Sequence, residues 1–75
     1  MMTLQEAVAE VTHELNNAIM KHPARTDSPR HHHSVLEEEF DEFWDAIKAD
    51  DFVGARKEAI QVAAMAIRYL MEAKP

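Results

Sequence analysis

Several features that support other classes of protein are missing from this chain. It contains no cysteine, so neither a disulfide nor a thiolate metal site can reinforce a small core. No run of apolar residues approaches the ~20 that span a bilayer, and we expect no membrane insertion. The first residues have neither the basic start nor the apolar core of a signal peptide, which leads us to expect a cytoplasmic protein.

Positive charge is also scarce. Lysine and arginine contribute 8 residues against 14 aspartates and glutamates, and the formal net charge is −6. A protein that binds the nucleic-acid backbone needs a basic face, so we expect no direct nucleic-acid binding. An acidic protein that handles phosphates would need metal ions between its own charges and those of the ligand.

Apolar residues, in contrast, are abundant for the size of the chain. Its 75 residues form one domain, and a chain of this length buries only roughly 60% of the surface that it exposes when unfolded. Hydrophobic residues nevertheless make up 47% of the sequence. Because a monomer would leave much of this apolar surface in water, we expect self-association, as a homodimer or a dimer of dimers.

The periodicity of the apolar residues predicts an all-α chain, with three helices in a single domain over residues 1–75. The first two helices begin with the Ser/Thr-x-x-Glu capping box, and the third follows an N-cap aspartate. These capping residues are Thr3 with Glu6, Ser34 with Glu37, and Asp51. Pro23 and Pro29 disfavour helical geometry, so residues 23–33 are expected to form a loop. The expected helices cover residues 3–22, 34–49 and 52–73.

The third expected helix is apolar on two sides. A helix of this kind is buried on both sides, so we expect one side to face its own chain and the other to face a partner subunit. Its small residues would permit close helix approach, which makes it the candidate subunit interface. These small residues are Ala59, Ala63, Ala64 and Ala66. One apolar stripe comprises Ile60, Ala63, Ala64, Ile67, Leu70 and Met71, and the other comprises Val62, Met65 and Tyr69.

Carboxylates gather on two of the expected helices. Glu39 and Glu42 are three residues apart on one edge of the second helix's apolar stripe, and Glu58 begins one apolar side of the third. If these helices pack side by side, the carboxylates could converge on Mg²⁺ or Mn²⁺, hard cations that take oxygen ligands. A simpler interpretation is that the acidic residues solvate a helix face, because charge runs usually face water.

The order of these residues resembles a known signature. Glu38-Glu39-x-x-Glu42 followed by Glu58-x-x-Gln61 is similar to the Glu-Glu-x-x-Glu and Glu-x-x-Asp pair of the MazG-like, all-α nucleoside triphosphate pyrophosphatases. The similarity extends to the flanking segments, which are residues 34–37, 43–48 and 56–68. It covers roughly residues 13–71, which is most of the chain.

This resemblance implies hydrolysis of a nucleoside triphosphate between its α- and β-phosphates, with release of a monophosphate and pyrophosphate. It implies that Mg²⁺ or Mn²⁺ is held by Glu39, Glu42, Glu58 and Gln61. The implied catalytic carboxylates are Glu38, Glu39, Glu42 and Glu58, with Glu38 beside the metal as a group that orients water. Basic residues that could contact the substrate's phosphates are Lys21, Arg25, Arg30 and Lys57.

Position 61 departs from the signature, because it holds Gln where the pattern has Asp. An amide oxygen still ligates Mg²⁺, but the ligand set then carries three charges instead of four, so we expect weaker metal binding or a change of substrate or function. Two other interpretations stay open. One is a non-catalytic helical dimer of the same fold that binds a metal, a nucleotide or a protein partner. The other is a helical interaction module whose acidity serves solubility.

Two further groups have both a structural and a functional interpretation. His31–His33 lie in the expected loop, where they could cap the second helix or approach substrate phosphates, and we do not expect a dedicated zinc site there. Phe40, Phe43 and Trp44 could stack on a nucleobase. Aromatic residues at helical spacing are more often part of a core, so we expect these three to be buried.

Overall fold

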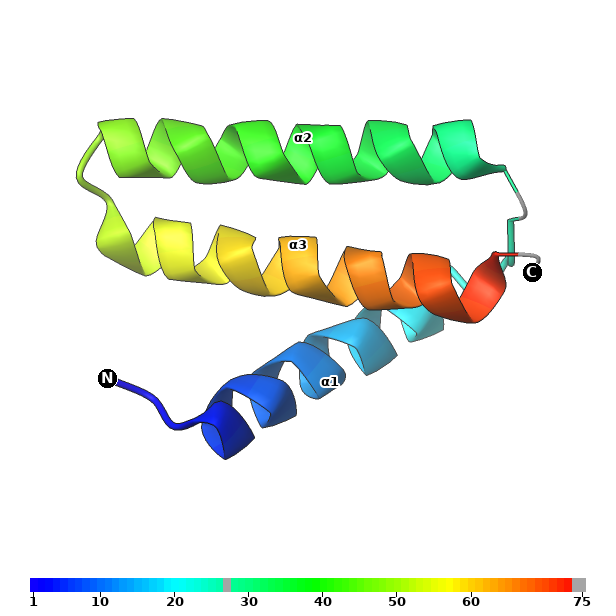
Figure 1. The fold of residues 1–75 in the computed structure, drawn as a ribbon, viewed down its shortest axis with the longest axis horizontal. Helices are drawn as coiled ribbons and strands as arrows, with labels where there is room; N and C mark the ends of the chain where they lie inside the picture. The colour runs from blue at the N-terminus through cyan, green and yellow to red at the C-terminus, as the bar shows by residue number, and fades with distance from the viewer. Residues whose placement is uncertain (27, 74–75) are drawn as a thin grey trace.

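Three helices joined by short connections make up the fold (Figure 1). The computed structural model describes residues 1–26 and 28–73. In this part of the chain no strand occurs and no helix is long and apolar enough to cross a membrane. The prediction of an all-α chain with three helices is therefore confirmed. The helices are α1 (Leu4–Lys21), α2 (Pro29–Lys48) and α3 (Phe52–Glu72).

The last helix, α3, is the centre of the arrangement. It runs antiparallel to α2 along most of its length, while α1 crosses it at an angle on the other side (Figure 1). The connection between α2 and α3 is only three residues long, so the two helices must be neighbours. The acidic residues near the middle of α2 are thereby brought next to the first turns of α3.

The starts of α1 and α3 agree with the capping signals in the sequence. Thr3 and Glu6 form a full capping box, in which each backbone N–H donates to the other side chain at 3.1 Å. After α2, Asp50 adopts the left-handed conformation with φ of 55°, which ends the helix. Asp51 then accepts the N–H of Gly54 at 2.9 Å as the N-cap of α3.

The predicted start of α2 at Ser34 was wrong. Ser28 is the actual N-cap and accepts the N–H of His31 at 3.2 Å, and Pro29 occupies the first helical turn. Residues 29–33 of the predicted loop are consequently helical. Proline suits this position because the first N–H groups of a helix have no intrahelical partner. The Ser34 hydroxyl donates instead to the backbone carbonyl four residues earlier, at 3.0 Å.

A buried polar network joins the ends of all three helices. Arg68 and Glu72 of α3 are only 9% and 8% exposed, and Arg68 Nε donates to Glu72 Oε2 at 2.6 Å. His32 of α2 is 8% exposed, and its Nε2 lies 3.7 Å from Glu72 Oε1. Arg68 also donates to backbone carbonyls at and beyond the end of α1. The acceptors are Ala18, His22 and Ala24. The network therefore holds the connection between α1 and α2 against α3.

The apolar core of this chain is thin. In the described residues, the buried apolar side chains are Leu15, Ala55 and Ala64. Phe43 is half-buried, but Phe40 and Trp44 are 58% and 54% exposed, so the prediction that all three aromatic residues are buried was wrong. Other large apolar side chains that are more than half exposed are Met1, Leu4, Val8, Met20, Phe52, Val53, Leu70 and Met71.

Both apolar stripes of α3 contact its own chain in part. On the α2 side, Tyr69 packs its ring edge-to-face on His32, with 5.1 Å between ring centroids. On the α1 side, Ala64 is fully buried. Other members of the stripe that contains Ala64 stay open, with Ile67 and Leu70 at 39% and 76% exposure. The expected partner subunit is thus a prediction about the exposed part of α3 and not about a whole side of the helix.

Candidate metal centre

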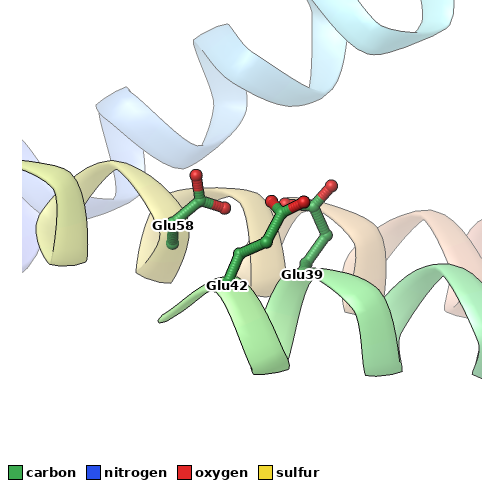
Figure 2. A group of neighbouring side chains, drawn as sticks. All are labelled: Glu39, Glu42 and Glu58. Atoms are coloured by element: carbon green, nitrogen blue, oxygen red, sulfur yellow. The ribbon is translucent and has the colours of Figure 1, made fainter. Parts of the chain in front are cut away.

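Three glutamates from α2 and α3 lie together on one side of the helix pair. Glu39 and Glu42 are one turn apart on α2, and Glu58 reaches them from α3 (Figure 2). One carboxylate oxygen of each residue lies within 4.8 Å of the other two. This is the convergence that the sequence predicts if the two helices pack side by side.

The local sequence explains why these side chains meet. A spacing of three residues puts Glu39 and Glu42 on the same face of α2. Glu58 is in the second turn of α3, and the tight connection after α2 places that turn beside the last three turns of α2. No long-range feature is needed to bring the three carboxylates together.

One oxygen in this group has no partner. Glu58 is half-buried, and its Oε2 is buried without a hydrogen bond to any described residue. Burying an unpaired carboxylate oxygen costs free energy, and such atoms usually bind a hydrogen-bond donor or a cation. This oxygen is therefore the observation that most distinguishes the group from a solvated acidic face.

The pKa values of the group reflect mutual repulsion. Burial raises the pKa of Glu39 to about 7, and the adjacent Glu58 carboxyl group and the charges of Glu42, Glu58 and Glu38 add to the effect. The pKa of Glu42 is raised mainly by the close approach and the charge of Glu58. Between the ordinary carboxyl pKa and about 7, the folded chain holds protons that the unfolded chain has released, so the free energy of unfolding falls as pH rises. A bound cation would remove this cost.

A cavity of about 540 Å³ opens over the carboxylates. Its volume falls within the roughly 300–1,000 Å³ that is typical of small-molecule sites. All three helices contribute to its lining, which combines acidic, basic and amide side chains. The polar residues that line it are Glu14, Lys21 and His22 from α1 and its end, Glu39 and Glu42 from α2, and Lys57, Glu58 and Gln61 from α3.

Two of the four basic residues predicted to contact phosphate lie at this cavity. Lys21 and Lys57 line it from α1 and α3. Arg25 does not, because its guanidinium donates to the carbonyls of Met71 and Glu72 at 3.3 and 3.2 Å. Arg30 is exposed in the first turn of α2 and also lies outside the cavity lining. The structure thus brings together the two lysines with the carboxylates, but not the two arginines.

Of the two remaining signature residues, Gln61 lies at the cavity and Glu38 does not. Glu38 is exposed and does not line the cavity, although its charge contributes to the raised pKa values of Glu39 and Glu42. Gln61 does line the cavity, with its Nε2 donating to Glu14 Oε1 at 2.6 Å. Gln61 is therefore the fourth signature position that the structure places at the site.

Sequence reasoning missed two residues of the cavity. Glu14 and His22 line it, and both come from α1 or its end, outside the segment that carries the signature. A signal for Glu14 exists: it is three residues after Val11 and four before Ala18, at the edge of the apolar stripe of α1. An acidic side chain at the edge of a buried face is a position to test for a site.

The three consecutive histidines take no part in the acidic group. His31 and His33 are exposed on the first two turns of α2, and His32 is buried against Glu72. Within residues 1–26 and 28–73, the group with metal-ligand spacing is the three glutamates, and it includes no histidine. The observed role of His32 is in packing α2 against α3.

Comparison of this chain with protein-family models, curated proteins and solved structures finds no match. The resemblance to the MazG-like pyrophosphatases therefore stays a prediction, which rests on the residues of the signature and on the geometry described above.

Proposed function

We propose that this chain is a Mg²⁺- or Mn²⁺-dependent nucleoside triphosphate pyrophosphohydrolase of the MazG-like kind, which releases a nucleoside monophosphate and pyrophosphate. The observation that carries the proposal is the convergence of one carboxylate oxygen each from Glu39, Glu42 and Glu58 within 4.8 Å of one another, together with a buried Oε2 of Glu58 that has no hydrogen-bond partner in the described residues. A cluster whose own charges raise its pKa values is suited to a cation.

The residues present fit a hard divalent cation. Glu39, Glu42 and Glu58 would hold it through carboxylate oxygens, and the Gln61 amide oxygen is the fourth candidate ligand. When bound, the cation supplies positive charge that offsets the phosphates and activates water for hydrolysis. Lys21 and Lys57 on the cavity wall would bind the phosphate oxygens and orient the chain of phosphates. We assign Glu38 an indirect role, through its charge on Glu39 and Glu42.

A second candidate is a non-catalytic helical dimer that binds a metal ion, a nucleotide or a protein partner in the same cavity. Gln61 favours this candidate, because it carries one ligand charge less than the Asp of the signature and its side chain donates a hydrogen bond to Glu14. The two candidates differ in whether the bound phosphate chain is cleaved.

A release assay separates these candidates. Purified protein is incubated with a panel of natural and modified nucleoside triphosphates in the presence of Mg²⁺ or Mn²⁺. We expect equal amounts of pyrophosphate and nucleoside monophosphate from at least one substrate, and no product when a chelator is present. Metal and nucleotide binding without any pyrophosphate release would favour the non-catalytic candidate.

We also propose that the chain works as a homodimer or a dimer of dimers, joined through α2 and α3. Phe40 of α2 and Ala59, Val62 and Ala63 of α3 line an apolar hollow of about 180 Å³. Trp44 is exposed one turn beyond Phe40 on α2. Contiguous apolar surface of this kind is rare on monomers, and a second copy of the chain would cover it.

Light scattering tests this assembly. The chain has a mass of 8.6 kDa, and we expect a particle of at least twice that mass. Replacing Phe40 by Glu should shift the protein toward monomer, because it buries a charge in the proposed interface. Met20, which is 80% exposed on α1, provides the matched control, and Met20→Glu should leave the mass unchanged. A monomeric wild-type protein at micromolar concentration would contradict the proposal.

A further inference from the structure

The contact between α1 and α3 at the cavity wall is made by an acid and an amide. Gln61 Nε2 donates to Glu14 Oε1 at 2.6 Å, and the two residues are 47 positions apart. Both side chains are partly buried, and both line the cavity that contains Glu39, Glu42 and Glu58. They also line a neighbouring cavity of about 380 Å³. The pair thus stands on the wall between two hollows, where solvent screens it less than at an open surface.

The chemistry of the two groups fixes the orientation of the amide. A carboxylate offers only acceptor atoms, whereas a glutamine amide has a donor end and an acceptor end. Glu14 therefore engages the nitrogen of Gln61, and the amide oxygen is left available at the other end. Oxygen is the atom that Mg²⁺ and Mn²⁺ take from an amide, so the α1 residue decides which end of Gln61 is offered to the cavity.

The charges around the cavity also favour an acid at position 14 beside an amide at position 61. Glu14 brings a fourth carboxylate to the cavity from α1, while position 61 on α3 is neutral. An acid at position 61 would lie against Glu14, and two carboxylates at this distance would repel each other. The charge that Gln61 lacks relative to the signature is thus present on the neighbouring helix.

We infer that Glu14 is a positioning residue of the proposed metal site. It holds the Gln61 amide so that its oxygen is presented to the cation, and its charge replaces the one that position 61 lacks. This inference rests on the proposed function, since it requires a divalent cation at Glu39, Glu42 and Glu58. It accounts for Gln at position 61, because the carboxylate that α3 lacks there is supplied by Glu14 of α1.

An exchange of the two residues tests the inference. Four proteins are compared: wild type, Glu14→Gln, Gln61→Glu and the double variant that carries both changes. Mn²⁺ binding is measured by titration calorimetry, and the stability of the metal-free proteins by chemical denaturation. We expect Glu14→Gln to weaken Mn²⁺ binding about 10-fold, as the loss of a group that orients a ligand commonly does. We expect Gln61→Glu to lower the stability of the metal-free protein, because it places two carboxylates together.

The double variant should recover both properties, with Mn²⁺ affinity and metal-free stability close to those of wild type. Glu10→Gln is the matched control on α1, because Glu10 is exposed and pairs with Arg56 and not with Gln61, and it should bind Mn²⁺ as wild type does. A merely structural contact would alter stability without altering Mn²⁺ affinity.

The outcomes distinguish this inference from the proposed function. If wild type binds Mn²⁺ and Glu14→Gln binds it equally well, or if the exchange fails to restore affinity, the inference is wrong and the metal site remains. If the exchange behaves as expected but no triphosphate is cleaved, the inference holds and the proposed reaction is wrong. If wild type binds no Mn²⁺, the metal site and the inference are both wrong.

Discussion

Replacing Glu58 by Gln is expected to lower pyrophosphate release on the order of 100-fold while making the metal-free protein more stable. Glu58 carries the buried oxygen without a partner, and its carboxylate raises the pKa values of Glu39 and Glu42. An amide has no charge, so the substitution relieves repulsion in the metal-free cluster. The same substitution removes a ligand charge from the cation, which supplies several kcal/mol of transition-state stabilisation in phosphoryl transfer, and activity falls.

The opposite signs of these two effects identify a ligand site, because a purely structural cluster would lose stability when one member is removed. Activity is measured as pyrophosphate release, and stability by denaturation without metal at a pH above the raised pKa of Glu39. Asp41→Asn is the control: Asp41 is an exposed acid on α2, and we expect neither property to change. Full activity of Glu58→Gln, or a metal-free protein that is less stable than wild type, would remove Glu58 from the assigned role.

Local signals in the sequence were sufficient for most of the fold. The capping box at Thr3 and Glu6 and the N-cap at Asp51 are interactions between residues three positions apart, and the structure contains both. The predicted start of α2 was wrong because the sequence contains two capping signals there, one at Ser34 with Glu37 and one at Ser28. Ser28 followed by Pro29 begins the helix five residues before the expected first residue, and the extra turns let His32 reach Tyr69 and Glu72.

In the candidate site, too, local spacing predicts some residues and not others. Glu39, Glu42 and Glu58 belong to two consecutive helices with a tight connection, so their meeting follows from helical spacing and from the shortness of that connection. Glu14 belongs to α1, whose position against α3 is set by contacts across more than forty residues. The spacing within α1 places Glu14 only at the edge of a buried face and does not encode the register of α1 against α3, and Glu14 was missed for that reason.

The buried network at the end of α3 supplies part of that register. Arg68 donates to carbonyls of Ala18 and His22, and His22 also lines the carboxylate cavity. The guanidinium thereby ties the last turn of α1, which lines the cavity, to α3. Stability and site geometry are coupled through this one side chain, although it does not itself line the cavity.

The second large effect is expected on folding: Arg68→Met should lower the free energy of unfolding by about 3–5 kcal/mol, the cost of breaking a buried ion pair by removing one partner. Burial alone would raise the pKa of Glu72, but hydrogen bonds from Arg68 and Thr26 outweigh it and lower the pKa. Without Arg68, the buried Glu72 carboxylate would lose its cationic partner and keep only the N–H of Thr26 among these donors, and the carbonyls of Ala18 and His22 would lose the guanidinium. A loss of this size is a large part of the roughly 5–15 kcal/mol that stabilises a typical domain.

Two further variants test whether the loss of stability comes from the broken Arg68–Glu72 pair. Unfolding of all variants is followed at equal protein concentration. Arg56 forms an ion pair with Glu10 at 3.0 Å, but both side chains are about half exposed, and Arg56→Met should cost under about 1 kcal/mol because water screens the pair. Adding Glu72→Met to Arg68→Met should recover part of the loss, since the stranded carboxylate is then gone. Equal costs for the two arginines, or a double variant less stable than Arg68→Met, would contradict the assignment of the loss to a buried Glu72 carboxylate that lacks its arginine.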